Sequence, residues 1–519
     1  MIKKISKEHL FIFIIYMISF SFMLLNKGIN NDDPYLVHQS LEVFRNFVLE
    51  IGVLSVAWLY YFVSFFAEFF IYRFISFLSY LIAVFLLYSI LQRIKEIDKF
   101  SRFLLVLFFA IAPLNIHRIS ICAMGYAVHY CLFFLAFWLF CVFLEKRYFY
   151  LRILSIVLFF VSFFVNSLLV FYLVPMLYLI YFYRDKIKNV FDLLKNLLRY
   201  WDFLILPLLF FALRHLFFSP VINYNKMEIK NILPALYNTL EIYYESFFVP
   251  LKIACTWQLA FPYILFGIIG GAVLFILLKK KGKEYLYDKK YFFFLFVIFL
   301  FFIAAYPYVF IGKRPVYYSY QSRHQLLLPL GFSFMIVYGI RIVCSFFKSN
   351  KGLMSTILCC FFIMAFMTFN LVTYAKFQTM YYKQLSIIEH IKESDIIKNN
   401  QVAFTDSSTY LNGHYVSLTD REMSYLFYEA YGLKDKEIRK KLIFDRFAVE
   451  PKKEYNNLDE IDFFRNQDKK LADYEVLIES KYNANFVNLL KLLYYEYFNK
   501  EKFIKEIRTV VYFKYIKKK

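Results

Sequence analysis

The amino-acid sequence predicts an α-helical polytopic membrane protein of about eleven transmembrane helices, followed by a small C-terminal extracytoplasmic α/β domain. Of the 519 residues, 61% are hydrophobic, whereas a soluble globular protein is nearer half apolar. The excess lies in long blocks of Phe, Leu, Ile, Val and Tyr, many of which approach the ~20 residues that a helix needs to cross a bilayer. From about residue 375 these blocks end, and short apolar runs alternate with charged residues, as in a soluble domain.

Eleven apolar blocks are predicted to span the membrane. The first follows a basic N-terminal segment and resembles a signal peptide, but no small-residue cleavage site follows it, so we interpret it as an uncleaved span. The predicted spans are 10–25, 74–91, 103–114, 126–144, 152–165, 167–183, 202–218, 259–278, 291–310, 325–345 and 353–371.

The distribution of basic residues predicts the orientation of these spans. With the N-terminus in the cytoplasm, the cytoplasmic segments hold 24 Lys and Arg residues and the external segments of the membrane block hold 11. This bias follows the positive-inside rule, and it puts the C-terminal domain outside the cytoplasm. The predicted cytoplasmic segments are 1–9, 92–102, 145–152, 184–199, 279–290 and 341–351.

The first external loop, residues 26–73, contains an apolar stretch whose placement needs a separate argument. Phe47–Phe70 is apolar enough to span, but spanning would turn the four basic residues of 92–102 outward. The stretch also carries Glu50 and Glu68, which are costly in lipid. We therefore predict helices that lie in the external interface or pack against the bundle.

The chain is predicted to divide into a membrane module, residues 1–375, and a soluble extracytoplasmic domain, residues 376–519. The soluble part has the size of one ordinary domain. Its segment Ser417–Glu422 has the pattern of a capped helix start. The other predicted elements are strands at 401–406, 474–479 and 510–513 and a helix at 485–500.

Several classes of site are absent from the sequence. The seven cysteines all precede residue 376, and none has metal-binding spacing to another Cys or to a His. No P-loop, zinc signature or nucleophile elbow occurs. From Lys376 onward, 26 basic and 22 acidic residues form no basic stripe, so we expect no nucleic-acid partner. We interpret His117 and His129, which flank the second external loop, as structural residues.

An acidic pair in the first external loop is the best candidate for catalysis. Asp32 and Asp33 follow the first span within the segment Asn30-Asn-Asp-Asp-Pro-Tyr35. A carboxylate there can act as general base toward an acceptor hydroxyl. Its neighbour can orient the acceptor or hold a divalent cation. The alternative is a polar turn, because Asn, Asp and Pro are turn residues, and composition alone favours that alternative.

The positive-inside rule explains the cytoplasmic basic residues but not those on the predicted external side. An Arg at a membrane surface can hold a phosphate with two hydrogen bonds, and both lipid-linked sugars and headgroups carry phosphate. For any single residue the alternative is snorkelling of its charge to the headgroups. The segment Gly312–Gln325 is harder to explain in that way, because it puts three cations and three tyrosines just before a span. The candidate phosphate contacts are Arg73, Arg118, Lys313, Arg314, Arg323 and His324.

The order of these features resembles the C-type glycosyltransferase superfamily, particularly bacterial relatives of the protein O-mannosyltransferases and the lipid A aminoarabinose transferases. The shared features are the acidic pair, a long first loop that leads through Phe66–Ser76 into a span ending at Gln92-Arg93, a next span ending in Pro113, and the late loop Ser322–Pro329. The resemblance covers roughly residues 1–345 as a pattern of sparse positions.

The resemblance implies a polyprenyl-phosphate-linked sugar donor and a site on the outer face of a bacterial inner membrane. Those enzymes carry an Asp-Glu pair followed shortly by Tyr. By resemblance, Asp32 would be the base, with Asp33, which stands where Glu is usual, as the alternative base, and Tyr35 would complete the motif. Arg73 and Arg323 match the Arg residues that the family often carries at the start of the second span and in the late loop.

The chain also departs from the family pattern. Relatives often carry a further acidic residue near the start of the fourth span, where this sequence reads Gly125-Tyr-Ala-Val-His-Tyr130. This puts in doubt any residue role carried over from the second loop. The soluble domain matches no domain of the family that we can name.

These features predict a membrane glycosyltransferase that moves a sugar from a polyprenyl-phosphate donor to an extracytoplasmic lipid, glycan or protein. The first alternative is a transporter or flippase for a lipid-linked glycan, which would also use external cations. Transporters usually show internal repeats and spans broken by Gly or Pro, whereas this chain has 13 Gly, 12 Pro and no visible repeat. The second is a surface-polysaccharide polymerase or ligase, which shares the donor but not the acidic pair.

Overall fold

The protein is described from a computed structural model. The described residues are 7–30, 33–38, 49, 52–66, 69–217, 241, 244–256, 270–272, 275–276, 292–311, 313, 315–317, 320–347, 350–414, 416–431, 442–444 and 472–518.

Six helical segments among the described residues are long and apolar enough to cross a membrane, which makes the chain an integral membrane protein. A seventh span results if α11 (Val190–Leu198) and α12 (Trp201–Phe217), which meet at an angle of 65°, are counted as one. The six segments are α1 (Lys7–Leu25), α5 (Phe69–Leu91), η2 (Ile121–Ala123) with α7 (Met124–Lys146), α9 (Asn166–Phe171) with α10 (Leu173–Tyr183) and η3 (Arg184–Lys186), α17 (Leu328–Ser345) and α18 (Lys351–Glu393).

The predicted count of eleven spans therefore stays a prediction. Two of the predicted spans form helices shorter than a bilayer needs, namely α6 (Lys99–Ile111, 13 residues) and α8 (Phe149–Ser162, 14 residues). A third forms α16 (Phe292–Val309). The predicted span 259–278 lies almost entirely outside the described residues.

Buried polar contacts join the helices of the membrane block, as expected where lipid gives helices no hydrophobic reason to associate. The Tyr16 hydroxyl of α1 donates to the Phe77 carbonyl of α5 at 3.0 Å. The Ser155 hydroxyl of α8 donates to the Ala136 carbonyl of α7 at 2.9 Å. The Asn370 amide of α18 donates to the carbonyl of Ile111, the last residue of α6, at 2.8 Å.

Part of the apolar stretch 47–70 forms a short helix, α4 (Leu54–Ser64), which packs on the start of α7. The Tyr60 hydroxyl donates to the Ile121 carbonyl at 2.8 Å, and Ala57 and Val63 contribute to a small apolar cluster with Met124. With 11 residues, α4 is too short to cross a bilayer. The remaining short elements of the block are α2 (Asp33–His38), η1 (Ile116–Ile119), η5 (Tyr244–Phe248), α14 (Val249–Thr256) and η6 (Tyr320–Gln325).

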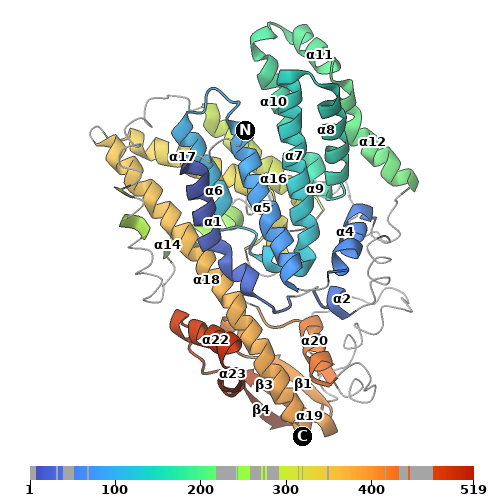
Figure 1. The fold of residues 1–519 in the computed structure, drawn as a ribbon, viewed down its shortest axis with the longest axis vertical. Coiled ribbons are helices and arrows are strands. Elements are labelled where there is room, and N and C mark those ends of the chain that lie inside the picture. The colour runs from blue at the N-terminus through green and yellow to red at the C-terminus, as the bar shows by residue number, and fades with distance from the viewer. Residues whose placement is uncertain are drawn as a thin grey trace.

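Ion pairs gather the predicted cytoplasmic segments at one end of the bundle, opposite the C-terminal domain (Figure 1). Each pair joins two segments that the positive-inside count assigns to the same side. These pairs are Lys99–Glu8 at 3.4 Å, Arg93–Glu145 at 3.0 Å, Arg341–Asp98 at 2.6 Å, and Arg184–Glu96. The described residues of these five predicted cytoplasmic segments therefore lie at one end of the bundle.

The C-terminal domain contains a mixed β-sheet with the strand order β2-β1-β3-β4. The central strand β1 (Val402–Asp406) pairs in parallel with β2 (Leu442–Phe444) and β3 (Tyr474–Glu479), and β4 (Tyr512–Lys517) pairs antiparallel with β3. The helices are α19 (Asp395–Asn399), η7 (Thr409–Leu411), α20 (Asp420–Tyr431), α22 (Phe486–Phe498) and α23 (Lys500–Ile507). The prediction of a small α/β domain in this part of the chain is confirmed.

A capping box begins α20, where the sequence predicts a helix start. The Thr419 backbone N–H and hydroxyl donate to the Glu422 carboxylate at 2.7 and 3.0 Å. The Glu422 backbone N–H donates back to the Thr419 hydroxyl at 3.3 Å. This reciprocal pair satisfies donors that the first turn of a helix leaves free.

One long helix, α18, connects the two parts of the chain. It runs without interruption for 43 residues from the bundle into the C-terminal domain (Figure 1). The change in composition near residue 375 therefore falls inside a helix. Two polar residues in the second half of α18, which made that half resemble a soluble segment, have partners in other segments: Gln384 binds the loop after α1, and Lys383 binds Asp406 of the C-terminal domain.

Candidate functional site

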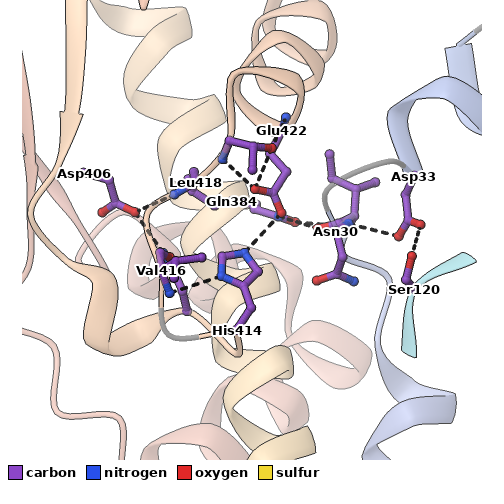
Figure 2. A network of polar contacts seen from close by, with 12 residues as sticks. Asn30, Asp33, Ser120, Gln384, Asp406, His414, Val416, Leu418 and Glu422 are labelled. Carbon is purple, nitrogen blue, oxygen red and sulfur yellow. Dashed lines mark hydrogen bonds and ion pairs between the residues drawn. The ribbon is translucent and has the colours of Figure 1, made fainter. Parts of the chain in front are cut away.

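Four segments that are distant in sequence meet where the bundle faces the C-terminal domain. They are the loop after α1, the η1–η2 loop before α7, the η6 loop before α17, and residues 406–422 of the C-terminal domain. The backbone N–H of Asn115 donates to the Gln325 side chain at 3.0 Å, which joins the η1 and η6 loops. Figure 2 shows the layer that runs from Asp406 and His414, across Gln384, to Asp33.

Asp33 is completely buried and binds protein donors through both carboxylate oxygens. Its Oδ1 accepts hydrogen bonds from the Ser120 hydroxyl and, at 3.0 Å, from the Cys122 backbone N–H. Its Oδ2 accepts from the Asn30 backbone N–H at 2.9 Å. Burial raises the pKa of Asp33, although the charge of Arg73 and the hydrogen bonds oppose the shift. Asp33 therefore anchors the first loop to the η1–η2 loop.

Arg73, the predicted phosphate contact at the start of α5, is also fully buried. Its Nε donates to the Ile119 carbonyl at 2.9 Å, and its two Nη atoms donate to the carbonyls of Asn26 and Gly28. These irregular backbone segments have no helix or sheet partner for the three carbonyls, and a buried carbonyl needs one. In this arrangement all three nitrogens of the Arg73 guanidinium already bind backbone carbonyls.

Arg118 is the second predicted phosphate contact that the structure buries. Its guanidinium carbon lies 4.5 Å from the centre of the Phe20 ring and 4.7 Å from that of Tyr80, a cation–π arrangement. It donates to the carbonyls of Leu114 and Asn115 at 3.1 and 3.3 Å. These contacts make Arg118 part of the support of the η1 loop.

In the late loop, Arg323 and His324 each lie against an aromatic ring. The Arg323 guanidinium lies 3.5 Å from the centre of the Tyr320 ring, and its Nε donates to His324 Nε2 at 3.4 Å. The His324 ring lies 5.0 Å from that of Tyr308. Burial and the nearby charge of Arg323 lower the pKa of Lys313 to about 8. Two partly buried cations that repel each other favour the binding of an anion.

His117 lies between the late loop and the C-terminal domain. Its backbone N–H donates to the Ser322 hydroxyl at 3.2 Å, and its Nδ1 lies 3.3 Å from the same hydroxyl. Its ring stacks on that of His414, with centroids 6.2 Å apart and planes inclined by 16°. Burial, followed by the charges of His414 and Arg323, holds the pKa of His117 well below its ordinary value.

The C-terminal domain fixes the first loop through α18. The Gln384 side chain accepts from the Ile29 backbone N–H at 3.1 Å and donates to the Ile29 carbonyl at 2.8 Å, as a neighbouring strand would. At the preceding position, Lys383 binds Asp406 of β1. Side chains of one helix thus join the first loop, which carries the acidic pair, to the central strand of the sheet.

Three of the predicted site residues lie wholly or partly outside the described residues. Asp32 and Arg314 lie outside the described residues, and of Tyr35 only the backbone, in α2, is described. The residues that sequence analysis missed are Ser120, Lys383 and Gln384. Their partners lie 87, 23 and 355 positions away along the chain, so no local pattern points to them.

Among the described residues, no three His, Cys, Asp or Glu side chains form a group that could hold a metal ion. A divalent cation bound by the acidic pair would involve Asp32, which is not among them. No protein-family model matches the chain. A search of curated proteins finds no significant match to it either. The resemblance to the C-type glycosyltransferases therefore stays a prediction.

Proposed function

We propose that this chain is a membrane glycosyltransferase that moves a sugar from a polyprenyl-phosphate donor to an extracytoplasmic acceptor. The acceptor is a lipid, a glycan or a protein. In this proposal the chain lies in a bacterial inner membrane with its N-terminus in the cytoplasm. The C-terminal domain and the loops that it contacts then face outward, where the acceptor is.

The observation that carries the proposal is the meeting of the acidic first loop and the cationic late loop at one end of the bundle. Both loops contact the short η1–η2 segment, Asp33 through Ser120 and the late loop through Ser322 and His117. Sugar transfer from a lipid phosphate needs a base for the acceptor and positive charge for the leaving phosphate. The spans beside these loops offer an apolar environment for the polyprenyl tail.

The two aspartates take different roles in the proposed reaction. Both oxygens of Asp33 bind protein donors, so Asp33 acts as a positioning residue that holds the first loop. Asp32 is the general base and removes the proton of the acceptor hydroxyl. The hydroxyl oxygen then bonds to the anomeric carbon while the bond from that carbon to the phosphate oxygen breaks. Lys313 and Arg323 stabilise the polyprenyl phosphate that leaves.

The test is sugar transfer from a labelled polyprenyl-phosphate sugar by the purified chain in lipid vesicles. Asp32→Asn should lower the rate by roughly 10²–10⁴-fold and leave thermal stability unchanged, because only proton acceptance is lost. Asp33→Asn should lower both the rate and the stability, because it loses charge-assisted hydrogen bonds. Asp185→Asn, a change at the opposite end of the bundle where the carboxylate is exposed, is the matched control.

Arg323→Lys separates donor binding from proton transfer in the same assay. Lysine keeps the charge but cannot make two parallel hydrogen bonds to a phosphate, so the donor KM should rise more than in either Asp variant. A glycan flippase would instead give no transfer with any variant and only mild effects of the Asp changes. Normal transferase activity of the double Asp32→Asn, Asp33→Asn protein would refute the proposal.

A further inference from the structure

One ring nitrogen of His117 is buried and has no hydrogen-bond partner among the described residues. The side chain has no exposed surface, and Nε2 is the atom without a partner. A buried donor without a partner is costly, and in folded proteins such exceptions call for a specific explanation.

The hydrogen bonds of the other ring nitrogen define which proton His117 carries. Because the Ser322 hydroxyl oxygen accepts from the His117 backbone N–H, its own hydrogen is available for Nδ1, 3.3 Å away. Nδ1 is then an acceptor, and the ring proton is on Nε2. Burial and the charge of Arg323 keep the pKa of His117 low, so the ring is neutral near pH 7. Nε2 therefore presents an N–H group.

Aromatic contacts from three segments hold the ring in one orientation. The rings of Tyr320 and Phe377 meet it nearly at right angles, with centroids 5.2 and 6.0 Å away. The ring of His414 stacks on it from the C-terminal domain. A donor whose direction is fixed before a ligand binds loses little entropy when the ligand arrives.

Two other buried histidines at this end of the bundle, His129 and His414, pair both ring nitrogens. His129 binds the Ser55 hydroxyl and the Gly125 carbonyl, each at 2.6 Å. His414 binds Glu422 and the Val416 backbone N–H, each at 3.4 Å. His117 differs from these two histidines, because its Nε2 atom has no hydrogen-bond partner among the described residues.

The charges around His117 indicate what its free donor binds. Arg323 lies beside His117, because the Tyr320 ring is 5.2 Å from the His117 ring and 3.5 Å from the Arg323 guanidinium carbon. Arg323 is also close enough to Lys313 to lower its pKa. We propose that the Nε2–H group of His117 donates a hydrogen bond to a phosphate oxygen of an anion that Arg323 and Lys313 also bind. The proposal concerns phosphate binding alone, and it rests on the proposed function only for the identification of that anion as the sugar donor.

The experiment measures ligand binding and stability in the full-length protein in detergent micelles. The probes are a short-chain prenyl monophosphate and inorganic phosphate, each followed by the shift in melting temperature across a concentration series. His117→Phe keeps an aromatic ring and removes the free donor. Its affinity for the prenyl monophosphate should fall by about 10–100-fold, the range expected for a hydrogen bond to a charged group. Without ligand, it should melt at the same temperature as the native protein or higher.

Two further variants serve as controls. His129→Gln alters a buried histidine whose nitrogens are both paired, so it should lower the melting temperature without changing phosphate affinity. His117→Gln keeps an N–H donor on a shorter side chain and should retain part of the affinity that His117→Phe loses. Binding of the prenyl monophosphate alone would identify a lipid-linked ligand. Equal binding of inorganic phosphate would identify a site for the phosphate group itself. Both results support the inference.

Native phosphate affinity in His117→Phe would overturn the inference, as would a loss of ligand-free stability like that of His129→Gln. Neither result would contradict the proposed function if the native protein still transfers sugar. Conversely, weak phosphate binding by His117→Phe together with no sugar transfer by the native protein would leave the inference in place and refute the proposed function.

Discussion

Lys383 and Asp406 form a buried ion pair that joins α18 to the central strand of the C-terminal sheet. The Lys383 ammonium donates to both carboxylate oxygens at 2.7 Å and to the Asn412 side chain at 2.8 Å. The two side chains are 0% and 4% exposed. Asp406 also accepts from the backbone N–H groups of Ser408 and Leu418 at 3.0 and 3.2 Å. Every group in this network has partners, as a buried charge requires.

Replacing Lys383 with Met should destabilise the protein strongly. Loss of one partner of a buried pair leaves an uncompensated charge, here that of Asp406, and typically costs about 3–5 kcal/mol. The melting temperature in detergent should therefore fall. The double Lys383→Met, Asp406→Leu protein should recover much of the loss, because no charge is then left buried.

The matched control is Lys491→Met in the exposed pair Lys491–Glu506, whose N–O distance is 2.8 Å. It should have little effect, because water screens exposed pairs. Equal melting temperatures for Lys383→Met and Lys491→Met would show that the buried pair contributes nothing.

Gly413→Ala should disturb the contact between the C-terminal domain and α18. A Cβ atom at Gly413 would come within 2.4 Å of the Phe377 ring, which is itself buried, so the ring or the loop has to move. Overpacking of this kind typically costs about 1–3 kcal/mol. Gly339→Ala in α17 is the control, since its Cβ would have no atom within 4 Å, and Ala favours a helix over Gly. A melting temperature that falls equally in both variants, or in neither, would contradict this expectation.

The sequence predicts those parts of the fold that depend on local patterns. Apolar blocks predict α5 and α7 to within a few residues, and short apolar runs predict β1 and β3. The pattern from Ser417 to Glu422 predicts the start of α20. In each case the residues that form the element also carry the signal, because helix and strand periodicity and capping act over a few positions.

The length of α18 and the roles of the site residues could not be predicted in this way. Lys376, Lys383 and Gln384 make the second half of α18 read as the start of a soluble domain, although it continues the helix. The polarity of Lys383 and Gln384 is explained by partners in distant segments. Likewise, Arg73 fits an exposed phosphate contact until the carbonyls of the first and second loops are found around it.

Gln384→Leu should reduce sugar transfer without preventing membrane insertion. The change removes both hydrogen bonds to Ile29 and leaves a buried backbone N–H and carbonyl unpaired, at a cost of about 1–3 kcal/mol each. The first loop, which presents the acidic pair, then loses its register against α18. Transfer assays in vesicles with equal amounts of inserted protein measure the effect. Gln92→Leu, an exposed position at the opposite end, should remain active. Full activity of Gln384→Leu would show that α18 does not position the loop.

Lys313 makes both the stability of the ligand-free protein and the binding of the donor depend on pH, in opposite directions. Burial and the charge of Arg323 lower its pKa to about 8, below the value of ~10.4 expected in the unfolded chain. Between these values the unfolded chain binds more protons than the folded protein, so the Lys313 contribution makes the ligand-free protein more stable as the pH rises through this window. Donor binding has the opposite dependence, because a phosphate is attracted only by the charged ammonium.

The donor KM should therefore increase as the pH rises through about 8, while the melting temperature of the ligand-free protein does not fall over the same range. Lys313→Arg should remove this increase in KM, because the arginine pKa exceeds ~12 and its charge persists at every pH in the assay. Steady-state transfer rates at several donor concentrations, measured from about pH 7 to 9.5, give the KM values. A KM that stays constant in the native protein, or that rises equally in Lys313→Arg, would exclude Lys313 from the donor site.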